Sequence, residues 1–184
     1  MDIRILNATG PDMKFEPSTQ HSVCSYPINR DPYEDKLIEV KESSVSQAGQ
    51  GIFAKRDILP GTVVAFYNGT RIPPDTEDDD DDKWENCAYK IFIENDENQL
   101  EEKRERMDIP ESLRNINLYC ATLAHKINHS FKPNCKFGRY HHPIFGTIPC
   151  VSTLQFIPMG SELFTYYNYP LDDCPQWYTD LWES

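Results

Sequence analysis

Short apolar runs, interrupted by proline, glycine and asparagine, limit this chain to short strands. The segments 51–54 and 62–67 are rich in β-branched and aromatic residues, and Pro60-Gly61 separates them. Asn68-Gly69 follows at once and is typical of a turn that tolerates a positive φ. The pattern predicts a mainly β fold of the α+β class, with several small sheets and few short helices.

The rest of the sequence predicts further short strands and two candidate helices. The expected strands are 37–40, 89–93, the two arms of a 143–157 hairpin that turns at Gly146, and 162–169. The charged segment 97–107 has no glycine or proline and indicates an exposed helix or a disordered insertion, which only Leu100 and Met107 could anchor. Small and apolar residues over 118–127 indicate a short helix.

The composition is that of one globular domain. The chain has 184 residues, 39% of them hydrophobic, which suffices for a single core. No apolar run approaches the roughly 20 residues of a membrane span, and the N-terminus lacks the apolar stretch of a signal peptide. The six cysteines include no Cys-x-x-Cys pair, so we expect free buried thiols. These features predict an intracellular protein without a membrane partner.

The chain is strongly acidic. A formal net charge of -12 argues against direct nucleic-acid binding, because phosphate contacts require clustered lysine and arginine. A basic substrate is favoured instead. The run from Glu77 to Asp82 consists of carboxylates alone, and it is either a solvated loop or a patch that steers a basic peptide.

Two unusual clusters point to one functional site. The run from Asn128 to Asn134 is a polar elbow, since Pro133 prevents a helix and the other residues do not make an ordinary strand. About thirty residues later, the segment 162–169 places three tyrosines within four positions, at Tyr166, Tyr167 and Tyr169. Such a concentration of polar and aromatic residues indicates binding or catalysis.

A nucleotide-binding motif has to be weighed against this site. Residues 49–54 satisfy the pattern G-x-G-x-x-A of dinucleotide-binding loops. That site requires a helix directly afterwards, whereas Pro60-Gly61 stops the chain and the segment has the composition of a strand. The sequence therefore disfavours a dinucleotide site, although the glycines still predict a close approach of the backbone to another group.

A zinc site is the second alternative. His125 and His129 have the i, i+4 spacing of zinc proteases, but Lys126 stands where the catalytic glutamate should be. A zinc site could still be drawn with Cys135, His141 and His142. We expect no metal, because a cation beside the metal is unfavourable.

Four segments in order resemble the SET-domain protein lysine methyltransferases. Residues 48–54 resemble the glycine-containing first motif of this family, and 66–69 resemble the strand and turn that follow it. The elbow at 128–134 and the segment 162–169 resemble its central elbow and closing strand. Each motif is weak alone, but their common order and spacing make the match specific.

Further segments resemble one branch of this family, the histone lysine 4 methyltransferase whose SET domain follows MORN repeats. They are 31–33, 123–126, 142–146 and 176–178. The resemblance implies a β-clip fold with a C-terminal pseudo-knot. It divides the chain into an N-terminal extension at 1–31, a SET domain at 32–169 and a C-terminal segment at 170–184 that completes the cofactor and substrate site.

The resemblance also implies an activity and site residues. The activity is S-adenosylmethionine-dependent methyl transfer to the ε-amine of a lysine in a protein or peptide, such as a histone tail, by a monomer in the nucleus or cytoplasm. Tyr167 and Tyr67 would be catalytic. The substrate channel would be lined by Tyr169, Phe137 and Tyr89, and the cofactor would be bound by Ala48, Gly49, Gln50, Asn128, His129 and Trp177.

Phe137 is an informative departure from the branch. The monomethylating relative has a tyrosine near this position, whose hydroxyl narrows the channel, so the resemblance predicts that this chain can add a second methyl group. The rival hypothesis is a SET fold without turnover that binds basic peptides as an added edge strand. The sequence leaves the substrate protein open.

Overall fold

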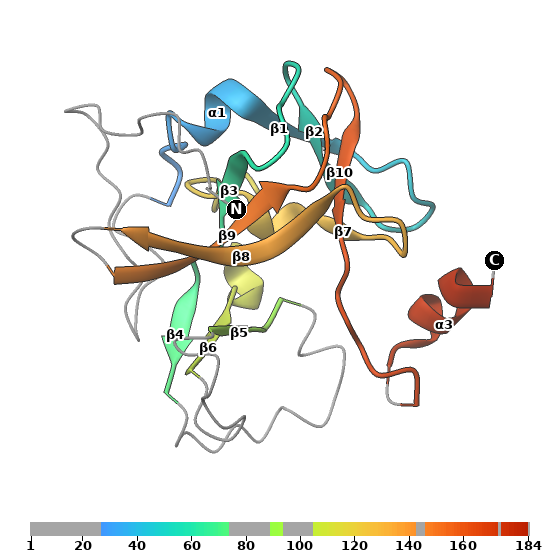
Figure 1. Ribbon diagram of the computed structural model, residues 1–184. Coiled ribbons are helices and arrows are strands. Elements are labelled where there is room, and N and C mark those ends of the chain that lie inside the picture. The colour runs from blue at the N-terminus through green and yellow to red at the C-terminus, as the bar shows by residue number, and fades with distance from the viewer. Residues whose placement is uncertain (1–26, 74–88, 94–104, 143–145, 173, 184) are drawn as a thin grey trace.

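The computed structural model describes residues 27–73, 89–93, 105–142, 146–172 and 174–183. Within these ranges the chain forms three small sheets and few helices (Figure 1). This arrangement confirms the predicted mainly β architecture. The acidic run from Glu77 to Asp82 lies outside the described residues, so both interpretations of it stay predictions.

The four-stranded sheet brings distant segments together. It has the order β1 (Ile38–Glu42), β2 (Gln50–Ala54), β10 (Glu162–Thr165) and β7 (Asn128–His129). Strand β10 pairs antiparallel with β2 and parallel with β7. As a result, the last strand of the chain lies inside this sheet, next to the polar elbow that begins with β7.

The other two sheets have three strands each. One has the order β3 (Val63–Phe66), β9 (Gly146–Thr153) and β8 (Cys135–His142), and the other has β4 (Thr70–Ile72), β6 (Glu105–Asp108) and β5 (Ile91–Ile93). The hairpin predicted over 143–157 is wrong in its bounds and its turn, because its arms are β8 and β9. Gly146 does not form the turn, because it opens β9 and pairs with His142 of β8.

The helices are short, and neither candidate helix is confirmed in the described residues. Residues 105–108 form β6, in which the buried Met107 pairs with both Arg71 and Ile91, and 97–104 lie outside the described residues. The predicted helix over 118–127 is reduced to the 3₁₀ turn η3 (Ala124–Lys126). A second 3₁₀ turn, η2, covers Glu111–Leu113. The α-helices are α1 (Glu34–Leu37) and α3 (Gln176–Glu183).

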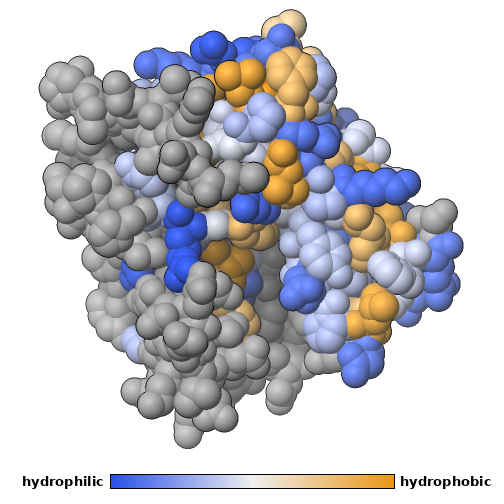
Figure 2. All heavy atoms as spheres, viewed as in Figure 1, coloured by the Kyte–Doolittle hydropathy of each residue, from blue (hydrophilic) through white to orange (hydrophobic). Residues whose placement is uncertain are grey.

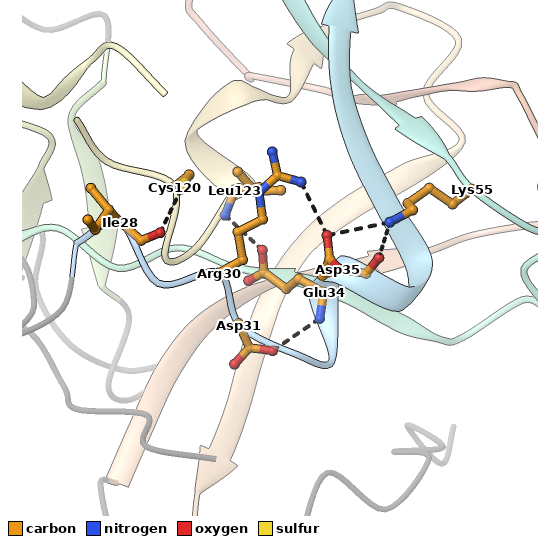
Figure 3. Close-up of polar contacts among 8 residues, drawn as sticks. All are labelled: Ile28, Arg30, Asp31, Glu34, Asp35, Lys55, Cys120 and Leu123. Atoms are coloured by element: carbon orange, nitrogen blue, oxygen red, sulfur yellow. Dashed lines mark hydrogen bonds and ion pairs between the residues drawn. The ribbon is translucent and has the colours of Figure 1, made fainter. Parts of the chain in front are cut away.

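Helix α1 attaches the N-terminal segment to the core (Figure 3). The fully buried carboxylate of Glu34 accepts hydrogen bonds from the backbone N–H groups of Phe66 and Leu123, at 2.7 Å and 2.8 Å. Burial, followed by the neighbouring carboxylate of Asp31, raises the pKa of Glu34 well above its usual value. Asp31, which precedes the helix, in turn accepts the N–H groups of Tyr33 and Glu34 at 2.7 Å and 3.0 Å.

The described cysteines are free. Cys135 and Cys150 are buried, as predicted, and burial raises the pKa of each thiol to about 12. Cys120 and Cys174 are free but only partly buried, which corrects the prediction for these two. The face in Figure 2 shows hydrophobic residues in several separate groups among hydrophilic ones. In the described part of the chain, no helix combines the length and apolar character that a membrane crossing requires.

Candidate functional site

The polar elbow and the tyrosine segment are adjacent. Besides the pairing of β7 with β10, the N–H of Ser130 donates to the carbonyl of Thr165 at 2.9 Å. The side chain of Asn134 donates to the carbonyl of Glu162 and accepts the N–H of Phe164, both at 2.8 Å. The elbow therefore binds β10 at both of its ends, so the two sequence clusters form one region.

The tyrosines follow the strand rather than forming it, which corrects the predicted strand over 162–169. Strand β10 ends at Thr165. Asn168 has a positive φ of 58°, which an extended strand does not allow, and Pro170 has no N–H with which to continue a ladder. The aromatic side chains are therefore free of the alternation that a strand would impose.

Tyr167 is held at both its backbone and its hydroxyl. Its N–H donates to Nδ1 of His129 at 3.1 Å, and its hydroxyl donates to the carbonyl of Ile127 at 2.5 Å. Burial raises the pKa of Tyr167 far above its usual value, so the hydroxyl stays protonated. Because the hydroxyl hydrogen of Tyr167 is donated to Ile127, the lone pairs of the hydroxyl oxygen remain available to a ligand.

Tyr67 presents a second fixed hydroxyl from the end of β3. The buried side chain donates its hydroxyl hydrogen to the carbonyl of Tyr89. Its ring meets that of Phe137 edge-on, with 6.4 Å between the centroids. Burial, followed by the charge of Asp108, raises the pKa of Tyr67 well above its usual value. Tyr67 thus contacts two of the predicted channel residues, Tyr89 and Phe137.

The remaining predicted aromatic residues belong to one aromatic cluster that joins the elbow to α3. The ring centroid of Tyr169 lies 5.6 Å from that of Tyr167 and 6.3 Å from that of Trp177. His129 lies 6.1 Å from Trp177 and 4.6 Å from Tyr178. The cluster consists of His129, Phe131, Tyr166, Tyr167, Tyr169, Trp177, Tyr178 and Trp182. Tyr178, which belongs to the segment 176–178 but was not among the predicted site residues, is fully buried within it.

Two of the predicted cofactor residues, Gln50 and Asn128, meet beside the buried carboxylate of Glu162. The side-chain amide of Asn128 donates to the carbonyl of Gln50 at 3.1 Å and to Glu162 at 3.2 Å. The carboxylate of Glu162 also accepts the hydroxyls of Ser43 and Ser44, at 2.7 Å and 2.5 Å. This carboxylate network (Ser43, Ser44, Asn128 and Glu162) fixes the loop that leads to Ala48, Gly49 and Gln50, three exposed residues.

The carboxylate network also explains Gly51. A Cβ at this position would lie 3.0 Å from both Cδ of Glu162 and Nδ2 of Asn128, and closer still to Oε1 of Glu162. The predicted close approach of the backbone is thus confirmed, and the neighbouring group is a carboxylate of the protein itself. Gln50 also lines a cavity of about 650 Å³, together with Glu111, Arg114, Asn115, Ile116 and Asn117.

The two histidines of the alternative zinc motif have separate surroundings. The ring of His125 stacks on that of Tyr119, with 5.1 Å between centroids, whereas His129 lies in the aromatic cluster. Burial, followed by the charge of Lys126, lowers the pKa of His125 to about 3. Burial lowers the pKa of His129 to about 4. Within the described ranges, no three His, Cys, Asp or Glu side chains are grouped to hold a metal.

These lowered pKa values predict a loss of stability in mild acid. In the folded protein His129 stays neutral down to about pH 4 and His125 down to about pH 3. In the unfolded chain both histidines bind protons below about pH 6.5. The stabilisation is therefore present above pH 6.5 and decreases as the pH falls. Between pH 7 and pH 4.5 we expect a loss in unfolding free energy on the order of 2 kcal/mol for each histidine, measured by urea denaturation.

The control for this prediction is His125→Gln, which cannot titrate in this range. Between pH 7 and pH 4.5, the unfolding free energy of this variant should decrease by about half as much as that of the unmodified chain, because only His129 still contributes. If the variant and the unmodified chain lost the same stability between the two pH values, the expected contribution of His125 would be wrong.

Comparisons with known proteins agree with this architecture. The sequence pattern described as the SET domain matches residues 49–168. The chain is 36% identical over 183 residues to a protein from Halocynthia roretzi named Histone-lysine N-methyltransferase SETD7. The match includes 94% of this chain and 45% of that protein, so the chain spans about half the length of this relative.

Solved structures support the fold. The Chaetomium thermophilum Polycomb Repressive Complex 2 bound to GSK126 gives a TM-score of 0.54 at 23% identity, over 80% of this chain and 17% of that chain. A structure of ctPRC2 in an autoinhibited conformation bound to S-adenosylmethionine gives 0.51 at 22% identity, over 80% and 17% of the two chains. Together with a SET-domain match that includes more than half of the residues, these likenesses lead to one conclusion: the chain belongs to the SET-domain family.

Proposed function

We propose that this chain is an S-adenosylmethionine-dependent protein lysine N-methyltransferase that acts on a lysine in a basic peptide, such as a histone tail. The observation that carries this proposal is the pair of fixed, protonated hydroxyls of Tyr67 and Tyr167, which come from different parts of the fold and lie near enough for Tyr167 to influence the pKa of Tyr67. The name of the Halocynthia roretzi relative supports the same activity.

The channel residues address the main chemical obstacle, which is the proton on the lysine. Removing it at neutral pH costs roughly 4 kcal/mol, because the amine has a pKa near 10.4 in water. The rings of Tyr67, Phe137 and Tyr169 would exclude water from the ammonium group and so lower its pKa. The lone pairs of the Tyr67 and Tyr167 hydroxyls would accept hydrogen bonds from the amine and align it for in-line attack.

We propose that the cofactor binds between the loop at 48–50 and Trp177 of α3. When bound, S-adenosylmethionine supplies a methyl group on a positively charged sulfonium. In this structure the buried Nε2 of His129 has no hydrogen-bond partner among the described residues, and the adjacent Trp177 ring is half-exposed. This combination suits a planar base with polar edges. We assign its binding to Ala48, Gly49, Gln50, Asn128, His129 and Trp177.

We also place the chain in the branch whose SET domain follows MORN repeats. Its proposed parts are an N-terminal extension at 1–31, a SET domain at 32–169 and a C-terminal segment at 170–184. We propose a monomer that acts in the nucleus or cytoplasm, including on chromatin, and does not bind nucleic acid directly. The net charge of -12 supports a basic protein substrate over a polyanion.

Calorimetry with S-adenosylmethionine, followed by a methyl-transfer assay on lysine peptides, tests the proposed activity. We expect binding and transfer. Absence of cofactor binding would refute the methyltransferase, and binding of cofactor and peptide without transfer would support the inactive peptide-binding module. The zinc hydrolase alternative requires stoichiometric zinc in elemental analysis.

Phe137 is expected to set the number of methyl groups. Its ring meets that of Tyr67 edge-on and adds no hydroxyl to the channel, so a monomethylated lysine should still fit. The unmodified chain should therefore give dimethyl-lysine at exhaustive turnover, and Phe137→Tyr should stop at monomethyl-lysine, as measured by mass spectrometry of the peptide.

The matched control is Phe156→Tyr, which adds a hydroxyl at a side chain that is 47% exposed. This variant should give the same product distribution as the unmodified chain. Strict monomethylation by the unmodified chain would contradict the role of Phe137.

A further inference from the structure

Two cations contact the ring of Tyr89, the residue whose carbonyl accepts the hydroxyl of Tyr67. The guanidinium of Arg114 lies 4.8 Å from the ring centroid, and Nζ of Lys126 lies 5.6 Å from it. Both distances are within the range in which the negative face of a tyrosine ring attracts a cation. These contacts orient a residue that itself holds a candidate catalytic hydroxyl.

Arg114 is fixed in turn by the surrounding backbone. Its Nε donates to the carbonyl of Ile109 at 3.3 Å, and its own carbonyl accepts a hydrogen bond from Lys126 at 2.6 Å. Arg114 directly follows the 3₁₀ turn η2, and Lys126 ends η3. The ring and the two cations therefore form one unit, the Tyr89 clamp (Tyr89, Arg114 and Lys126), built from three separate segments.

The clamp is connected to the acceptors of both candidate catalytic hydroxyls. The hydroxyl of Tyr67 donates to Tyr89, and the hydroxyl of Tyr167 donates to Ile127, the residue after Lys126. Lys126 is only 8% exposed, and burial, followed by the charge of Arg114, lowers its pKa. Arg114 is the cation that lies nearer to the Tyr89 ring.

We propose that Arg114 is a positioning residue for the methyl transfer and acts through Tyr89 to orient the hydroxyl of Tyr67. This inference rests on the proposed function. Loss of the guanidinium frees the Tyr89 ring to move, and the carbonyl attached to it moves as well. The Tyr67 hydroxyl then spends less time in the orientation that aligns the lysine amine, which lowers kcat.

The test compares Arg114→Gln and Arg114→Lys, each alone and combined with Tyr67→Phe. We expect Arg114→Gln to lower kcat by about tenfold, since misplacement at a reacting centre is costly, and Arg114→Lys to restore most of it. In the Tyr67→Phe background, Arg114→Gln should have no further effect. The matched control is Arg56→Gln, at an exposed arginine that follows β2.

If Arg114→Gln lowered kcat equally in the unmodified chain and in the Tyr67→Phe background, the inference would be overturned, because Arg114 would then act without Tyr67. A loss that appears only as weaker S-adenosylmethionine binding would also overturn it, since Arg114 lines the same cavity as Gln50. A second readout does not need turnover: the ¹³C resonance of the Tyr67 ring, assigned with Tyr67→Phe, should shift in Arg114→Gln and not in Arg56→Gln. If the unmodified chain transfers no methyl group, the proposed function fails, while an unshifted resonance refutes the role of Arg114.

Discussion

Replacement of Tyr167 by phenylalanine is expected to lower kcat for methyl transfer by about 10²-fold to 10³-fold, the usual cost of losing one preorganised polar group at a reacting centre. The substitution removes only the hydroxyl, which is held by the carbonyl of Ile127. The ring contacts with Tyr169 and Trp177 and the N–H bond to His129 do not depend on the hydroxyl. Binding of S-adenosylmethionine should therefore change much less than the rate.

Single-turnover methyl transfer to a lysine peptide, with mass detection of the product, measures this effect. The control is Tyr166→Phe, which removes the hydroxyl of the preceding tyrosine. Tyr166 is 42% exposed. The unfolding free energy of both variants should also be measured by urea denaturation. Tyr167→Phe leaves the carbonyl of Ile127 without this donor, which costs about 1–3 kcal/mol of stability. Near-normal turnover by Tyr167→Phe, or an equal loss in Tyr166→Phe, would remove Tyr167 from the proposed mechanism.

Local turn chemistry and short apolar runs were sufficient to predict the general architecture. The segments on either side of Pro60-Gly61 form strands, and the three small sheets follow from many short strands separated by turn residues. The elbow and the tyrosine segment were predicted to meet, and the parallel pairing of β7 with β10 brings them together. Each of these features has its sequence signal within the segment that forms it.

The unconfirmed helices show where local signals fail. Over 118–127 the residues suit a helix, yet the N–H groups of Cys120 and Ala121 donate to the carbonyl of Pro27, and that of Leu123 donates to Glu34. Distant partners thus take the hydrogen bonds that a helix would need. Strand β6 is charged, but its position between β4 and β5 determines its conformation, since strand propensity depends strongly on neighbouring strands.

The carboxylate network was missed for a related reason. Glu162 opens a short strand, where a glutamate ordinarily faces water, and its bonding partners at Ser43 and Ser44 lie 119 and 118 residues earlier in the chain. Only the assembled sheet reveals that this carboxylate is buried. The one local signal was Gly51, whose small size predicted a close approach but not the group that approaches.

Gly51→Ala is accordingly expected to destabilise the fold by about 3 kcal/mol, the upper end of the usual cost of overpacking. The added methyl group would overlap Oε1 of Glu162, so the carboxylate must leave its position. The hydroxyls of Ser43 and Ser44 and the amide of Asn128 would then lose a shared acceptor. Urea denaturation at pH 7 measures the change.

Gly138→Ala is the matched control, because a Cβ there would meet no heavy atom within 4 Å and the backbone of β8 requires no positive φ. Its stability should remain within about 1 kcal/mol of the unmodified chain. Glu162→Asp in the Gly51→Ala background shortens the carboxylate and should recover part of the loss. If Gly51→Ala were as stable as Gly138→Ala, Glu162 would have room to move, and the loop at 48–50 would not depend on this network for its position beside Asn128.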